Sequence, residues 1–196
     1  MSTRDPLGTR QSGLTLIELV MFIVIVSVAL TGIVGAFNLN TQHSADPMVQ
    51  KQALAIAESL LEEIELMPFT YCDPDDANAT TAADAAGCAT TAEAMGPEAA
   101  QGETRYATAT PFDNVNDYNG FTMNAGNGGI LDITGAHVGG AGTLDAYSVV
   151  VATTPTALGA IAAADSLLIT VTVTGPGSTS VVLNGYRTRY APNATP

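Results

Sequence analysis

The sequence predicts an α+β protein in which a long N-terminal helix packs on a C-terminal antiparallel sheet. Three observations lead to this fold class. A strongly apolar run covers residues 14–37, apolar residues with helical spacing continue over 48–67, and β-type alternation begins only after residue 104. Helical and strand patterns that are segregated along the chain in this way are typical of α+β domains.

The apolar run has the length and flanks of a membrane-spanning helix. Residues 1–13 are polar and carry Arg4 and Arg10, whereas residues 19–45 contain no Asp, Glu, Lys or Arg. At about 1.5 Å per residue, residues 19–37 make a helix of roughly 28 Å, close to the hydrocarbon thickness of a bilayer. Because the cationic flank is N-terminal, we expect residues 1–13 to stay in the cytoplasm as a leader while the rest is exported.

The presence of Glu18 distinguishes this segment from ordinary export signals. A cleaved secretory signal has a shorter apolar run and a small-residue cleavage site, which FNLNTQHSADP does not provide. A plain signal anchor explains the length of the run but not Glu18, because a carboxylate near a membrane is costly and indicates function.

The residues from Gly13 to Glu18, Gly-Leu-Thr-Leu-Ile-Glu, resemble the class III signal of type IV pilins and pseudopilins. That resemblance implies cleavage between Gly13 and Leu14 by an inner-membrane prepilin peptidase, and N-methylation of the new terminus at Leu14, where the family usually has Phe. It also implies that Glu18 meets the N-terminal amine of a neighbouring subunit during assembly. The physics agrees, because cleavage leaves a charged amine at membrane depth, and pairing it with a carboxylate relieves much of the cost.

Two helical segments are expected, divided at the sequence around Pro47. Proline removes a backbone donor and kinks or restarts a helix, and Asp46 could cap the restarted one. We therefore assign 14–46 to a transmembrane or filament-core helix and 47–67 to an amphipathic helix. The predicted buried stripe of the second helix consists of Leu54, Ala57, Leu61 and Ile64, flanked by Leu60 and Met67. The glutamates Glu58, Glu62, Glu63 and Glu65 are expected mostly on a solvated opposite face.

Residues 68–103 read as an acidic loop that a disulfide closes. They are rich in Ala, Asp and Thr, and Cys72 and Cys88 lie in their first part. In an oxidising periplasm two cysteines are expected to pair, the alternative being free thiols. A loop of about fifteen residues closed in this way is stabilised by roughly 3 kcal/mol in the chain-entropy model.

Acidic side chains in this loop and in the later run 112–120 make weak calcium candidates. Oxygen ligands at such density suit calcium, but their spacing fits no EF-hand, and a solvated loop with Asx turns explains them better. We therefore assign no metal site and expect no cofactor. The candidates are Asp73, Asp75, Asp76, Asp113 and Asp117.

From residue 104 onward the sequence predicts a globular head rich in β-structure, extending to residue 196. Residues 105–110 alternate weakly, whereas 146–153 and 167–174 have the pattern of good strands. A turn at 175–178 then leads to a partner strand over 180–190. Together these segments predict three or four antiparallel strands packed on the helix.

Composition excludes several classes of function. The chain has six basic and nineteen acidic residues, a net charge of −13, so no basic patch offers a site for nucleic acid. Removal of Arg4, Asp5 and Arg10 with the leader leaves four basic and eighteen acidic residues, and the charge becomes −14. No nucleophile elbow, Walker loop or metal-ligand spacing is present, so we do not expect an enzyme.

Later segments extend the resemblance. The end of the helix at 66–69, the run 112–120 and the closing hairpin 173–187 resemble minor prepilin-like proteins of the mannose-sensitive haemagglutinin (MSHA) pilus system. The resemblance implies a minor subunit, held in the bacterial inner membrane with its head in the periplasm, that joins other pilin subunits in a filament at the cell surface. The alternatives are a type II secretion pseudopilin, a minor pilin of a twitching-type pilus, and a membrane-anchored adhesin that never polymerises.

Overall fold

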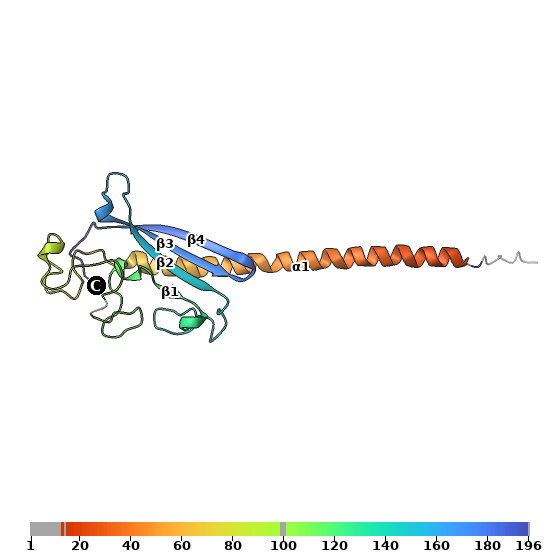
Figure 1. The fold of residues 1–196 in the computed structure, drawn as a ribbon, viewed down its shortest axis with the longest axis horizontal. Coiled ribbons are helices and arrows are strands. Elements are labelled where there is room, and N and C mark those ends of the chain that lie inside the picture. The colour runs from red at the N-terminus through yellow and green to blue at the C-terminus, as the bar shows by residue number, and fades with distance from the viewer. Residues whose placement is uncertain (1–12, 14, 99–100, 196) are drawn as a thin grey trace, which may run out of the picture. The chain divides into compact units, whose positions relative to one another are not determined.

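The computed structural model describes residues 13, 15–98 and 101–195, apart from the side chains of residues 38–46 (Figure 1). The predicted leader, except for Gly13, and the predicted new terminus Leu14 lie outside the described residues. The chain divides into two compact units, Met1–Ala45 and Asp46–Pro196. This division falls close to the predicted boundary at 46–47.

A single helix, α1 (Leu16–Leu66), enters both units and contains Pro47 within it. The helix continues through Pro47, where the sequence predicts a kink or a restart. A proline removes one hydrogen bond of the helical ladder, and long helical runs on both of its sides can accommodate that loss.

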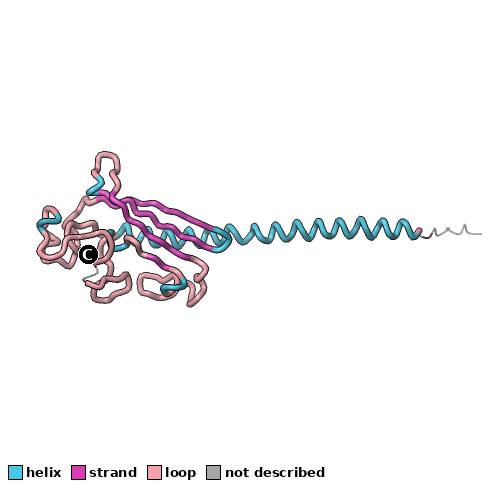
Figure 2. Tube along the Cα trace, in the orientation of Figure 1, coloured by secondary structure: helices cyan, strands magenta, loops and turns pink. Residues whose placement is uncertain are grey.

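A four-stranded antiparallel sheet forms in the second unit, with the strand order β1-β2-β3-β4 (Figure 2). The strands are β1 (Thr122–Met123), β2 (Ser148–Pro155), β3 (Ser166–Gly175) and β4 (Thr179–Thr188). Val151 pairs with Val171, which in turn pairs with Leu183. The three long strands confirm the sequence-based assignment. Residues 105–110 contain no strand, because they form turns instead.

The core of the second unit lies between the sheet and the part of α1 that belongs to that unit. Alternate residues of β2 and β3 face it, as the sequence pattern predicts, and the outward residues of β3 include Thr170, Thr172 and Thr174. The buried strand residues are Val149, Val151, Leu167, Ile169, Val171 and Val173. Figure 1 shows β2 to β4 running alongside this part of the helix.

The buried face of the helix differs from the predicted stripe by a small rotation. It consists of Ala53, Ile56, Ala57, Leu60 and Ile64, spaced as one helical face. Leu54 is exposed and Leu61 only partly buried. The helix packs closely on β4 at Gly185, where a Cβ atom would collide with the Glu65 carboxylate and approach Leu61 Cδ1 to 3.0 Å.

Most of the chain between helix and sheet is loop, as predicted, held by short 3-10 turns. These are η1 (Ala85–Gly87), η2 (Val115–Tyr118) and η3 (Ala125–Asn127), with η4 (Ala163–Asp165) and η5 (Pro176–Ser178) between the later strands. Cys72 and Cys88 form a disulfide, which confirms the predicted pairing.

Candidate functional site

The N-terminal motif stands at the start of α1. Gly13 is exposed and lies outside the helix. Thr15 begins the helical hydrogen bonding, since its carbonyl accepts bonds from the backbone N–H groups of Glu18 and Leu19, both at 3.1 Å. Glu18 therefore lies in the first turn, where a carboxylate is favoured by the positive end of the helix dipole. Its side chain is exposed.

The apolar helix that follows is exposed within its own unit along nearly its whole length, Val26 alone being half-buried among residues 16–37. Leu16–Phe37 is 22 residues long with a mean hydropathy of 2.7, and it is the one helix in the described residues that is long and apolar enough to cross a membrane. Large side chains such as Phe22, Ile25 and Val28 are each more than 60% exposed. Such a surface is unfavourable in water and requires lipid or apolar protein partners.

The hydroxyl groups in this helix are satisfied by the helix itself. Ser27 Oγ donates to the Ile23 carbonyl at 2.7 Å, and Thr31 Oγ1 donates to the Val28 carbonyl at 2.9 Å. Polar groups in hydrocarbon need such internal partners, so these two residues are compatible with a membrane environment.

Asp76 holds the disulfide loop together. Its carboxylate accepts hydrogen bonds from the backbone N–H groups of Asn78, Ala89, Thr90 and Thr91, at 2.7 to 2.9 Å. These bonds, of which those from Thr91 and Ala89 act most strongly, hold the pKa of Asp76 well below its usual range. Asp76 is therefore an internal clamp of the loop, with backbone donors on both of its carboxylate oxygens.

Two groups of carboxylates gather where the segments 71–76, 93–98 and 113–117 meet, together with Glu103. We call these six residues the acidic cluster. Asp73, Glu103 and Asp113 form one group, and Glu93, Glu98 and Asp117 form the other. Within each group, one oxygen of every residue lies within 4.8 Å of the others. The groups are neighbours, because Glu103 Oε2 accepts a hydrogen bond from the backbone N–H of Glu98 at 3.2 Å.

Four members of the acidic cluster resist ionisation because they are buried and other carboxylates repel them. Burial, with the negative charge of Asp117, raises the pKa of Glu93 to about 10. Burial and the same neighbour raise the pKa of Asp113 to about 7. Burial also raises the pKa of Asp117 to about 6 and raises that of Glu103. The leading charge effects on these four groups come from other carboxylates, so the cluster has the electrostatic character of a cation site.

The basic residue nearest to this part of the head in the sequence is engaged elsewhere. Arg105 Nε donates to Glu63 Oε1 at 2.7 Å, and Arg105 Nη2 donates to Glu63 Oε2 at 2.6 Å. Tyr118 Oη donates to the same Glu63 at 2.7 Å. Burial works to lower the pKa of Arg105, but the hydrogen bonds and charge of Glu63 outweigh it and raise that pKa above its ordinary value.

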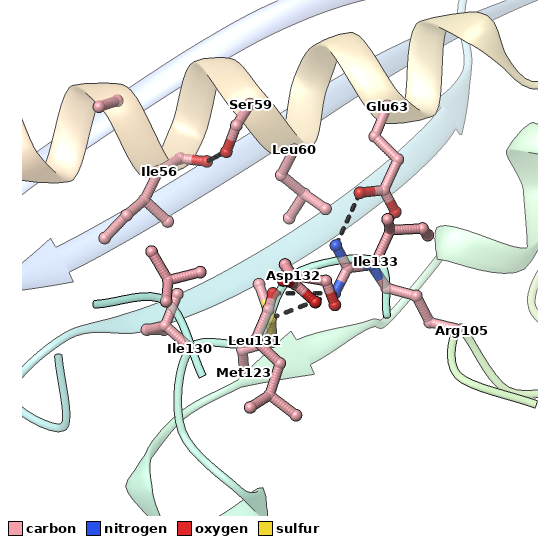
Figure 3. A pocket seen from close by; sticks show the side chains of 12 residues that line it. Ile56, Ser59, Leu60, Glu63, Arg105, Met123, Ile130, Leu131, Asp132 and Ile133 are labelled. Atoms are coloured by element: carbon pink, nitrogen blue, oxygen red, sulfur yellow. Dashed lines mark hydrogen bonds and ion pairs between the residues drawn. The ribbon is translucent and has the colours of Figure 1, made fainter. Parts of the chain in front are cut away.

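This ion pair borders an apolar pocket of about 410 Å³ between α1 and the 130–138 loop (Figure 3). Leu60, Met123 and Ile130 line its wall, and Arg105 Nη1 closes one end by donating to the carbonyls of Leu131 at 3.1 Å and Asp132 at 3.2 Å. The pocket presents few polar groups beyond this bonded network. We therefore interpret the pocket as a gap in the packing beside the Glu63–Arg105 ion pair, and not as a ligand site.

The structure brings together part of the predicted calcium candidates. Asp73, Asp113 and Asp117 join the acidic cluster, whereas Asp75 is exposed. Sequence reasoning missed Glu93, Glu98 and Glu103, although their regular five-residue spacing in an otherwise Ala-rich stretch was a usable signal. It also placed Glu63 on the solvated helix face, which is wrong, because Glu63 turns inward to Arg105.

No family model, curated protein or solved structure matches this chain. The functional proposal therefore depends on the residues and geometry of the chain itself.

Proposed function

We propose that this chain is a minor subunit of a type IV pilus of the MSHA kind. A prepilin peptidase cleaves it between Gly13 and Leu14, Leu14 is N-methylated, and the mature chain waits in the bacterial inner membrane with its head in the periplasm. It then joins other pilin or pseudopilin subunits in a filament that reaches the cell surface.

One observation carries this proposal. Glu18 lies in the first turn of an exposed apolar helix, five residues after Gly13, and a separate compact unit follows at Asp46. A helix that only anchors a domain needs neither Gly13 nor a carboxylate at its start. A helix that must pack among copies and relatives uses the carboxylate to fix its axial position against the amine of a neighbour.

The processing step is tested by mass spectrometry of the N-terminus after expression in a pilus-forming bacterium. The proposal expects a mature chain that begins at methylated Leu14, and a Gly13→Val variant that keeps its leader. An N-terminus that remains at Met1 in the wild-type chain would refute cleavage at this site.

The assembly role is tested by comparing Glu18→Ala with Glu58→Gln. Both variants remove one exposed carboxylate of α1, but only the first lies in the signal motif. Sheared filaments should contain the Glu58→Gln protein at wild-type level and lack the Glu18→Ala protein, which stays in the membrane fraction. If the Glu18→Ala chain is displayed and adhesive like the wild type, the chain is a membrane-anchored adhesin instead.

The choice among filament systems depends on the partner subunits. Crosslinking of the processed chain in cells should recover subunits of an MSHA-type pilus. Recovery of type II secretion pseudopilins or of twitching-type pilins would assign the chain to those systems.

A further inference from the structure

We propose that the acidic cluster binds calcium, with Glu93, Glu98 and Asp117 as the ligand set and Asp73, Glu103 and Asp113 as an adjoining acidic wall. This proposal does not depend on the pilin assignment. Its evidence is the geometry of the cluster together with buried oxygen atoms that have no donor.

The ligand set comes from two separate loops. Glu93 and Glu98 lie in the segment after the disulfide loop, and Asp117 lies in η2. A backbone hydrogen bond of 3.0 Å, from the N–H of Gly96 to the carbonyl of Asn116, holds these loops side by side. An ion at this position would therefore link two chain segments that a backbone hydrogen bond already holds together.

Buried oxygen atoms without hydrogen-bond donors are a second observation in favour of a cation, separate from the clustering of carboxylates. Asp117 is 1% exposed, and its Oδ2 accepts from the N–H groups of Asp113 at 2.9 Å and Asn114 at 2.8 Å. Its Oδ1 is buried without any hydrogen-bond partner. An acceptor buried in this way is destabilising unless a donor or a cation meets it.

Other buried oxygen atoms near Asp117 also have no hydrogen-bond partner. Both carboxylate oxygens of Glu93 are buried without partners, and so is Oδ2 of Asp73, a residue that is fully buried. The neighbouring amide oxygens Oδ1 of Asn114 and Asn116 are also buried and unpartnered. Every one of these atoms is an acceptor, and a divalent cation satisfies several acceptors at once.

The chemistry of the donors selects calcium. Carboxylate and amide oxygens are hard ligands, and neither group contains His or Cys, which zinc or copper would favour. The irregular loops that carry the ligands suit the flexible coordination of calcium better than the strict octahedron of magnesium. Three carboxylates also offset the charge of the ion, which relieves the mutual repulsion that raises the pKa values of Glu93 and Asp117.

Calcium binding is tested on the full-length protein in nonionic detergent after treatment with EDTA. Isothermal titration with CaCl2 at pH 7.5 should show saturable binding, with a dissociation constant of about 10⁻⁵ to 10⁻³ M, between the weakest sensor sites and extracellular calcium sites. Because the chain contains no Trp, tyrosine-sensitised terbium luminescence offers a second signal, which calcium should displace.

Three variants make the test specific. Glu93→Gln and Asp117→Asn should weaken calcium binding at least tenfold, while Glu58→Gln, an exposed helix residue, should bind like the wild type. Glu93→Gln replaces a buried carboxyl group that has no hydrogen-bond partner, so the calcium-free variant should be folded and at least as stable as the wild type. At calcium about 100 times the dissociation constant, the Tm of the wild type should rise by about 5 °C or more.

Two results would overturn the proposal. One is the absence of saturable binding up to about 10 mM calcium, roughly ten times the weakest affinity of known extracellular sites. The other is binding that Glu93→Gln and Asp117→Asn leave unchanged. In either case the unpartnered oxygens would be satisfied by shared protons, and calcium would not change the Tm of the wild type.

Discussion

Glu63 on α1 and Arg105 in the following loop form a bidentate ion pair, with N–O distances of 2.6 and 2.7 Å, at a depth where their side chains are 17% and 4% exposed. The guanidinium also donates to the carbonyls of Leu131 and Asp132. One side chain therefore ties the helix to two loop segments far apart in the sequence.

Replacement of Arg105 by Met should destabilise the head by about 3–5 kcal/mol, because it leaves the Glu63 carboxylate buried with Tyr118 as its remaining partner. Differential scanning calorimetry of the full-length protein in detergent measures the loss. The double variant Arg105→Met/Glu63→Leu should recover much of it, and Lys51→Met, an exposed basic residue on the same helix, should change little. A single variant as stable as the wild type would show that the pair does not hold these segments.

Reduction of the Cys72–Cys88 disulfide, which closes a loop with a sequence separation of 16, should cost about 3 kcal/mol and lower the Tm by about 6–12 °C. The cost arises because the reduced chain gains conformational freedom when it unfolds. A Cys72→Ala/Cys88→Ala variant serves as the control, since reductant should not change its Tm. Equal melting of the wild type with and without reductant would contradict the prediction.

Without calcium, the stability of the head should fall as the pH rises from 5 to 8. Asp113, Asp117 and Glu93 have folded-state pKa values of about 7, 6 and 10, all above their ordinary values near 4. Between the ordinary and the raised pKa, the folded state holds more protons than the unfolded state, so each rise in pH favours unfolding. The lowered pKa of Asp76 acts in the opposite sense, but only below about pH 4.

Melting curves in EDTA should show this pH effect as a drop in Tm of about 5 °C or more. The Glu93→Gln variant should show a smaller drop, because it cannot ionise at that position. A Tm that stays level or increases over this range would mean that the acidic cluster is not buried in solution.

Gly185→Val should destabilise the contact between β4 and α1 by about 1–3 kcal/mol, because the added atoms would displace the Glu65 carboxylate and press on Leu61. Ser180→Val, at an exposed position of the same strand, adds similar bulk without this collision and should be nearly neutral. Chemical denaturation of both variants measures the difference. Equal stabilities would show that the helix does not approach β4 this closely.

The regular parts of the fold were predictable because their signals are local. Val149 and Val151 alternate with more exposed neighbours, and the buried residues from Leu167 to Val173 alternate with half-buried ones, so strand position and buried face both follow from a period of two. The membrane-length helix follows from composition alone. The disulfide followed from the number of cysteines and from the oxidising compartment that the sequence predicts.

The acidic cluster could be predicted only in part because it depends on contacts between distant loops. Asp73, Glu93 and Asp117 belong to three segments with no repeating pattern, and only the folded backbone brings them together. Glu63 was misplaced for a similar reason. Its helical position is ambiguous between faces, and the partner that decides its direction, Arg105, lies 42 residues away.

The hydroxyl groups of the apolar helix, which bond to carbonyls of the same helix, affect its transfer from one apolar environment to another. Ser27 and Thr31 keep the carbonyls of their own helix as partners, so neither group must find a new one when the surroundings change. Under the proposed function, transfer of the helix from lipid into a filament replaces an apolar lipid environment by an apolar protein environment, at little electrostatic cost. Glu18 is then the group whose surroundings differ most between the membrane and the filament. A single carboxylate can therefore determine whether transfer from lipid to filament is favourable.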